Sequence, residues 1–271
     1  MNVFEKQEQG EMLNDLSSGG QIEIPACWSL ERVAGISASH PGNGWTAYWE
    51  GLGGTEAFFR EQAKEYVANL ECAIALNPTA HVLDFGCGFG FVAELLAPKL
   101  GQIFLWDTSV NMRRRARLKL ACHKNIRFLD LSEPQAIALD LKFDLIVVNS
   151  VVQYMSLEQF AACLVMWRTM LAPRGRIVLS DLIPPDYNSV SDILDLLKFS
   201  IRRNVFRSAL LQAMRDLGRY WRMRHGCPLT RISVEDLTKL SKNANLSLSC
   251  LPSNLTHFRG RLTAAFTHQD H

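Results

Sequence analysis

The stretch VLDFGCGFG, residues 82–90, constrains the fold of this chain more than any other. It begins as a short apolar strand, continues as a turn with glycines at alternate positions, and leads into FVAELLAP, which predicts a helix. The first N–H groups of a helix lack intrahelical partners and favour negative charge. Glycine tolerates a positive φ and lets a ligand reach the backbone. The stretch therefore predicts a pocket that accepts an anionic group.

Composition places the chain among ordinary globular proteins. Its 271 residues are 48% hydrophobic, which is enough for one large domain with a core. The formal net charge of +2 gives no global argument for nucleic acid. Residues 1–20 are polar and no run reaches about 18 apolar residues, so we expect a cytoplasmic protein without a transmembrane segment. The scattered cysteines form no CxxC pair, which predicts reduced thiols.

From residue 80 onward, strand-like apolar runs alternate with helical patterns. This alternation predicts an α/β fold with a parallel sheet wrapped by helices, and it places ligands beyond the carboxyl ends of the strands. A helix is predicted over residues 56–76, with Thr55 as its N-cap. The predicted strands cover residues 80–85, 102–107, 126–130, 143–150, 175–181, 246–251 and 261–266.

The chain divides into an arm and a domain. Residues 1–54 have no sustained period, and we expect them to form an N-terminal arm and lid. Residues 55–271 are expected to form one domain, with a helical cap insertion at about 186–230 between the fifth and sixth strands. Basic residues are frequent there, and only one acid interrupts them from residue 198 to residue 231. Such a face is either solvated or guides a phosphate-bearing, carboxylated or carrier-linked acceptor, an anionic membrane surface, or RNA.

The spacing of the glycines separates two kinds of nucleotide pocket. The dinucleotide fingerprint GxGxxG needs a third glycine where this chain has Phe91. The chain instead has DxGxGxG, with Asp84 two residues before Gly86. In this pattern it resembles the first motif of class I S-adenosylmethionine-dependent methyltransferases. The resemblance covers roughly residues 60–183 and 232–267, and it implies a Rossmann-like, seven-stranded, mostly parallel sheet with helices on both faces.

The resemblance implies S-adenosylmethionine as the cofactor and assigns residues to it. The glycine loop passes under the amino-acid end, and Asp84 helps to hold the ammonium group. Asp107 is placed to accept both ribose hydroxyls, although taken alone it could equally cap the helix at Val110. Asp130 meets the adenine amino group and the Leu131 N–H faces the ring, with a helix cap as the alternative for Asp130. The expected cofactor set is Tyr48, Asp84, Gly86, Cys87, Gly88, Gly90, Asp107, Thr108, Met112, Asp130, Leu131, Asn149, Ser150 and Gln153.

The segment FDLIVVNSVVQYM, residues 143–155, narrows the substrate class. It lacks the [DNS]PP[YF] motif of methyltransferases that act on DNA adenine or glutamine amides, and the Pro-Cys pair of cytosine C5 methyltransferases. Metal-dependent catechol methyltransferases keep a carboxylate here, whereas this chain has Asn149 and Ser150, so we expect no metal. The segment is similar to the small-molecule branch of the family, in which this loop runs between cofactor and substrate.

Methyl transfer from a sulfonium is an in-line displacement that depends on holding the acceptor beside the methyl carbon with water excluded. An oxygen acceptor usually needs a base as well. Tyr48 and Trp49 are expected to form aromatic walls around the sulfonium. The candidates for catalytic residues are His40, Tyr48, Tyr154, Asp181, Tyr187, His225 and His257, none of which has a distinguishing spacing.

Together these features predict a methyltransferase for a small organic acceptor. O-methylation in specialised, natural-product metabolism is the favoured reaction, and C- or N-methylation of a carrier-linked or phosphate-bearing acceptor is the alternative. One rival is an RNA methyltransferase that binds through the basic insertion, although we expect no nucleic acid. Another is a protein that keeps the cofactor pocket but performs a non-methyl reaction, since a fold does not fix a function.

Overall fold

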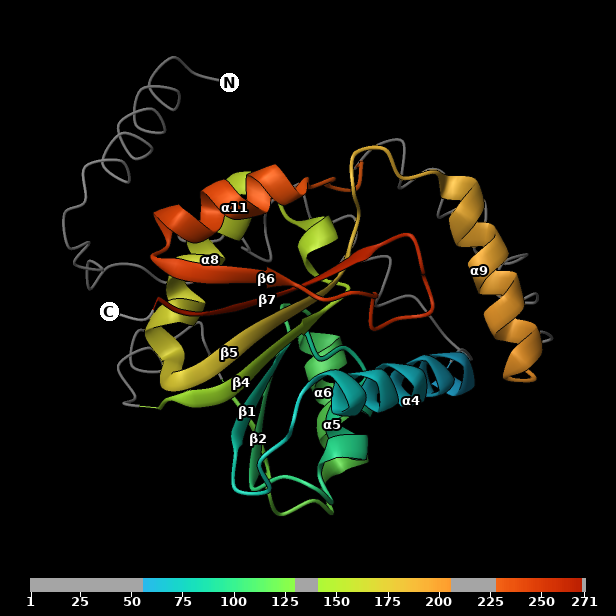
Figure 1. Ribbon diagram of the computed structural model, residues 1–271. Coiled ribbons are helices and arrows are strands. Elements are labelled where there is room, and N and C mark those ends of the chain that lie inside the picture. Colours follow the sequence, from blue (N-terminus) through green and yellow to red (C-terminus); the bar gives the residue numbers. More distant parts are fainter. Residues whose placement is uncertain (1–55, 130–140, 206–227, 270–271) are drawn as a thin grey trace.

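A seven-stranded sheet organises the molecule, as the computed structural model shows (Figure 1). The structure describes residues 56–129, 141–205 and 228–269. In space the strands follow the order β3-β2-β1-β4-β5-β7-β6. Their bounds are β1 His81–Phe85, β2 Gln102–Trp106, β3 Ile126–Phe128, β4 Phe143–Asn149, β5 Leu171–Leu182, β6 Leu246–Cys250 and β7 Leu262–His268.

All pairings among β1 to β5 are parallel, and β7 alone runs antiparallel to both of its neighbours, β5 and β6. The strand order reverses direction between β1 and β4, because the chain first builds outward through β2 and β3 and then returns to the other side of β1. Ligands of such sheets bind outside the carboxyl ends of the strands at this point. The predicted Rossmann-like, mostly parallel fold is confirmed.

Helices cover both faces of the sheet (Figure 1). One face carries α8 and α11, and the other carries α4, α5 and α6. Successive side chains of a strand point to opposite faces of the sheet. Leu83 and Phe85 of β1 therefore enter the core beside α8, whereas Val82 enters the core beside α4. The helix bounds are α4 Glu56–Ala73, α5 Phe91–Leu96, α6 Val110–Leu120, η2 Val152–Tyr154, α8 Leu157–Met170, α9 Ser189–Arg202 and α11 Val234–Asn243.

Most predicted elements are present, with shifted ends. β5 begins at Leu171, four residues before its predicted start, because Leu171 is buried and pairs with Phe143 of β4. The helix predicted over 56–76 ends at Ala73, and the Asn77 side chain then accepts hydrogen bonds in the turn that leads to β1. The proposed N-cap Thr55 lies outside the described residues.

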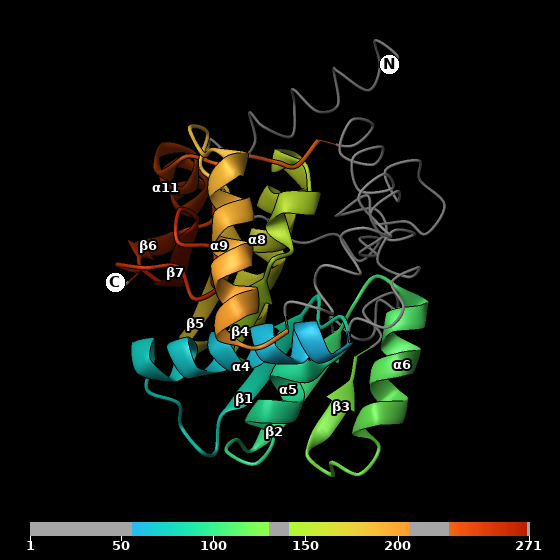
Figure 2. The ribbon, with the colours of Figure 1, turned by 90° about the vertical axis from the view of Figure 1, so that its right-hand side faces the viewer.

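The helix α9 lies within the predicted insertion and follows β5 along the chain. Figure 2 shows α9 standing beside the sheet, with one end at α4. Its buried Phe199 contacts Phe58 of α4 edge to face at a centroid distance of 5.7 Å and stacks on His257 at 4.5 Å. The rest of the predicted insertion, 206–227, and the expected arm and lid, 1–54, lie outside the described residues, so that division stays a prediction.

The described residues contain no helix that is both long and apolar enough to span a membrane.

Replacing Phe199 by alanine should lower the free energy of unfolding by about 3–5 kcal/mol, the usual cost of deleting a buried phenylalanine ring. Leu197→Ala on the same helix is the control, because Leu197 is 41% exposed and its loss should cost less than about 1 kcal/mol. Urea unfolding measures both values. Equal losses in the two variants would contradict the described packing of α9.

Candidate active site

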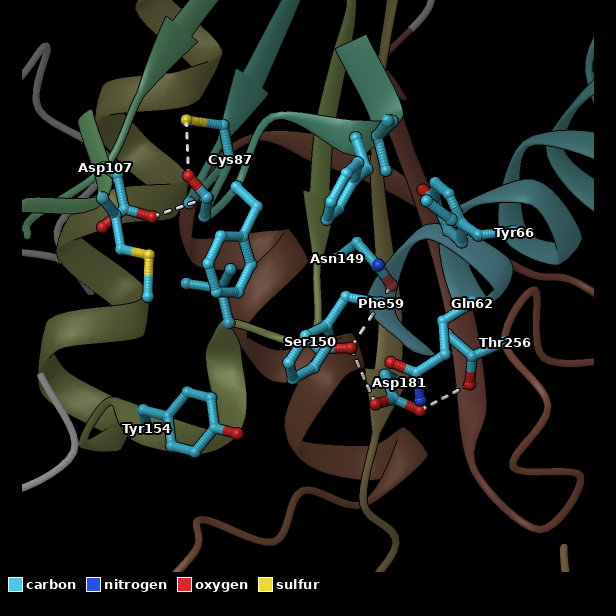
Figure 3. A pocket seen from close by; sticks show the side chains of 18 of the residues that line it. Phe59, Gln62, Tyr66, Cys87, Asp107, Asn149, Ser150, Tyr154, Asp181 and Thr256 are labelled. Carbon is cyan, nitrogen blue, oxygen red and sulfur yellow. Dashed lines mark hydrogen bonds between the residues drawn. The ribbon is translucent and has the colours of Figure 1, made fainter. Parts of the chain in front are cut away.

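A cavity of about 400 Å³ opens at the carboxyl ends of β1, β2, β4 and β5 (Figure 3). Its volume lies in the range of pockets that hold cofactors and small substrates. Eleven of the residues predicted from the sequence line it together, although they come from segments far apart in the chain. They are Gly86, Cys87, Gly88, Asp107, Thr108, Met112, Asn149, Ser150, Tyr154, Asp181 and His257.

The glycine loop has a different physical requirement at each glycine. All three residues have positive φ, which side chains rarely adopt. A Cβ on Gly86 would lie 2.4 Å from Val151 Cγ2, and one on Gly90 would lie 2.7 Å from Leu120 Cδ1, so these two glycines allow close packing. A Cβ on Gly88 would meet no atom within 4 Å. Gly88 therefore faces open space in the cavity. Gly90 is the N-cap residue of α5 and does not line the cavity.

The Asp107 carboxylate joins the glycine loop to the start of α6. Its Oδ2 accepts a hydrogen bond from the Gly88 N–H at 2.8 Å, and its Oδ1 accepts one from the Ser109 N–H at 2.8 Å. Ser109 is the N-cap of α6, because its hydroxyl accepts from the Met112 N–H at 3.1 Å. The alternative that Asp107 itself caps this helix is therefore wrong. Asp107 remains at the cavity wall, where the sequence predicts a ribose contact.

Asp84 is buried behind the loop, and its environment is unfavourable for a lone carboxylate. Among the described residues, Asp84 Oδ2 has no hydrogen-bond partner. Burial, and secondly the charge of Asp107, raise the pKa of Asp84 to about 7. A buried acceptor without a partner costs free energy, so this position fits a cationic donor supplied from outside the chain.

The ends of β4 and β5 meet at a strained pair of residues. Ser150 has a φ of 58° and Asp181 a φ of 71°, and neither is a glycine. The Ser150 hydroxyl donates to Asp181 Oδ2 at 2.8 Å, and Figure 3 shows both side chains at the cavity. Such backbone strain costs of order 1–3 kcal/mol per residue and persists where surrounding contacts hold it.

A buried charge network holds Asp181. Arg261 Nη1 donates to Asp181 Oδ2 at 2.9 Å and to Gln153 Oε1 at 2.9 Å. Arg261 Nη2 donates to Asp192 Oδ2 of α9 at 2.8 Å. Gln153 was expected to contact the cofactor, but its side chain faces Arg261 and it is not a lining residue. The reason is that a buried guanidinium needs several acceptors.

The predicted catalytic residues lie in three kinds of place. Tyr154, Asp181 and His257 line the cavity. Tyr187 does not, because its hydroxyl donates to Asp192 at 2.6 Å. Five predicted residues of the two sets lie outside the described residues, namely His40, Tyr48, Asp130, Leu131 and His225.

His257 is packed against aromatic rings, and its Nε2 lies 3.5 Å from Gln62 Nε2 of α4. Its ring lies 4.0 Å from the Phe258 ring and stacks on the ring of Phe199. Burial lowers the pKa of His257 to about 4 and so keeps the ring neutral near pH 7. A neutral imidazole has one nitrogen that can accept a hydrogen bond or a proton.

Sequence reasoning missed the contribution of α4 to the cavity. Phe59, Gln62 and Tyr66 of α4 line it, together with Thr256 from the loop before β7 (Figure 3). The apolar periodicity of this helix marks Phe59 and Tyr66 as core residues. The available signal was Gln62, a polar side chain at helical spacing between them, which an ordinary core face would not carry.

Residues 83–177 match the family model described as a methyltransferase domain. The chain is 31% identical over 129 residues to the biotin biosynthesis bifunctional protein BioCD of Bordetella avium (strain 197N), across 46% of this chain and 27% of that protein. It is 28% identical over 118 residues to nodulation protein S of Rhizobium tropici, across 43% of this chain and 49% of that protein. The chain thus spans about a quarter and about half of the length of these two curated relatives.

Solved structures share the fold. Magnesium protoporphyrin IX methyltransferase (ChlM) from Synechocystis PCC 6803 with bound SAM has a TM-score of 0.52 at 17% identity, covering 91% of this chain and 100% of that chain. The YcgJ protein from Bacillus subtilis has a TM-score of 0.51 at 13% identity, covering 76% of this chain and 99% of that chain. At these identities the likeness concerns the fold.

Asp84→Asn should change stability in a pH-dependent way. Because the pKa of Asp84 rises to about 7 on folding, the folded state keeps a proton that the unfolded state releases above about pH 4. The stability from that proton is fully present below about pH 4 and is lost as the pH rises through 7. Relative to the wild type, asparagine should gain about 2–4 kcal/mol between pH 4 and pH 8, as urea unfolding at both pH values measures.

Asp144→Asn, which removes an exposed carboxylate of β4, controls for the change in net charge. If the wild type and Asp84→Asn differ by the same free energy at both pH values, Asp84 does not carry the raised pKa.

Proposed function

Residues 83–177 carry a class I methyltransferase domain, and on this premise we propose that the chain transfers the methyl group of S-adenosylmethionine to a small organic acceptor. The observation that supports this most is the unpartnered Oδ2 of Asp84, buried behind an open glycine loop. A cofactor with an ammonium group and a carboxylate satisfies the buried carboxylate and the loop N–H groups together.

The residues present fit the cofactor. Asp84 would hold the ammonium group and the loop around Gly88 the carboxylate, while Asp107 would accept from the ribose hydroxyls. Thr108 and Met112 line the same part of the cavity and would contact the adenosine. When bound, the cofactor supplies an activated methyl group on a sulfonium.

Other residues that line the cavity suit an organic acceptor. Phe59 and Phe258 supply apolar walls that exclude water, and Gln62 and Tyr154 supply polar groups that orient a ligand. His257 is neutral near pH 7, so one ring nitrogen can accept the proton of an acceptor hydroxyl. This arrangement supports O-methylation with His257 or Tyr154 as the base, and a role in specialised metabolism in the cytoplasm is part of the proposal.

The alternatives differ in what they need from the site. An amine acceptor only has to arrive neutral, so His257 is not needed as a base for N-methylation. A carbon acceptor needs a stabilised carbanion. Methyl-labelled cofactor incubated with fractionated extracts identifies the acceptor from the labelled product. Labelled RNA would favour the RNA methyltransferase, and cofactor binding without any labelled product would favour a non-methyl reaction.

Asp107→Ala should weaken the binding of S-adenosylhomocysteine about tenfold or more, because it removes the proposed ribose acceptor and the bond that holds Gly88. Isothermal titration calorimetry measures the dissociation constant. Asp186→Ala is the control at an exposed loop position, and its affinity should match the wild type. Wild-type protein that gives no heat with this compound or with S-adenosylmethionine would overturn the proposal.

His257→Ala should reduce the turnover of an oxygen acceptor by about 100-fold or more, the usual contribution of a positioned base. Its affinity for S-adenosylhomocysteine should stay unchanged, because His257 lies on the acceptor side of the cavity. Tyr154→Phe distinguishes the two candidates in the same assay. If both variants turn over the acceptor as fast as the wild type, neither His257 nor Tyr154 acts as the base.

A further inference from the structure

A second cavity, of about 520 Å³, lies between α4, α9 and the loop 251–261. Figure 2 shows these segments meeting where the end of α9 reaches α4. We name it the basic cavity after its four cationic lining residues, which are Lys198, Arg202, Arg203 and Arg259. Two carboxylates, of Glu65 and Asp195, also line it, so the cations exceed the acids by two.

Within residues 56–129, 141–205 and 228–269, the acidic side chains do not neutralise this excess charge. Glu65 pairs with both Arg202, at 2.6 Å, and Arg203, at 3.1 Å, and one carboxylate cannot balance two guanidinium groups. Asp195 accepts a hydrogen bond from the backbone N–H of Arg259 at 2.9 Å. Among the described residues, the side chains of Lys198 and Arg259 have no carboxylate partner within ion-pair distance.

The basic cavity adjoins the candidate active site. Thr256 and His257 line both cavities, so the two cavities meet at this pair of residues. His257 stacks on Phe199 of α9, the helix that also carries Lys198. Thr256 donates to Asp181 Oδ1 at 2.7 Å and is thereby fixed to the end of β5. Both residues at the junction of the two cavities are therefore held in place.

We propose that the basic cavity binds an anionic group of the methyl acceptor, a phosphate or a carboxylate, while the reacting end of the acceptor lies in the cofactor cavity. This inference rests on the proposed function and names the substrate class. Guanidinium groups bind such anions with two parallel hydrogen bonds, and a lysine adds a point charge. Binding energy from this remote group would orient the acceptor beside the methyl carbon.

Calorimetry with inorganic phosphate and with glutarate, at constant ionic strength, tests the site and distinguishes its two possible anions. We expect the wild type to bind one of them, and Lys198→Ala/Arg259→Ala to bind it about tenfold or more weakly, since charged hydrogen bonds are lost. The control Lys242→Ala/Arg174→Ala removes the same charges from exposed residues elsewhere and should bind like the wild type. Lys198→Arg/Arg259→Lys keeps the charge and should retain binding.

Wild-type protein that binds neither anion, or a double alanine variant that binds as tightly as the wild type, would overturn the proposal. Titration of the same four proteins with S-adenosylhomocysteine tests the proposed function separately. If none of the four proteins binds S-adenosylhomocysteine, the proposed cofactor pocket is wrong. The titrations with phosphate and glutarate would still test the basic cavity. The labelled methylation product should be retained by an anion exchanger at neutral pH, and a neutral or cationic product would contradict an anionic acceptor.

Discussion

The bridge from Asp181 through Arg261 to Asp192 is the interaction on which the site depends. It joins the end of β5 to α9, and Arg261 stands one residue before β7. Because Arg261 and Asp181 are both buried, removing the guanidinium would leave the Asp181 carboxylate without its counter-charge, a loss of about 3–5 kcal/mol. The position of α9, and with it the stacking of Phe199 on His257 at the junction of the two cavities, follows from this bridge.

The other half of the site contains two neighbouring carboxylates. Asp84 and Asp107 stand at the carboxyl ends of neighbouring strands, and burial of both makes each charge unfavourable for the other. Asp107 is stabilised by the N–H groups of Gly88 and Ser109, whereas Asp84 Oδ2 receives no bond from the described residues. The molecule thus combines a carboxylate that needs a cation on one side with cations that need an anion on the other.

The sequence predicted the parts of the site that depend on short spacing. The glycine loop, Asp107 and the strands could be predicted because their signals, hydrophobic periodicity and turn chemistry, lie close by in the sequence. Gln153 and Tyr187 were assigned to the site, and no local signal could have shown otherwise. Gln153 pairs with Arg261, 108 residues away, and only the folded chain brings these side chains together. The contacts of α4 with the cavity also join distant segments, although Gln62 was a local signal for them.

The place of β7 in the sheet has a consequence for synthesis. Because β7 lies between β5 and β6 but follows both in sequence, β5 leaves the ribosome with one side unpaired, and it stays so until nearly ninety further residues have been added. An exposed strand edge invites pairing with other chains. Arg261 emerges just ahead of β7, so the same stretch that closes the edge also delivers the counter-charge to Asp181. Protection from aggregation and assembly of the reaction centre are therefore completed in one step.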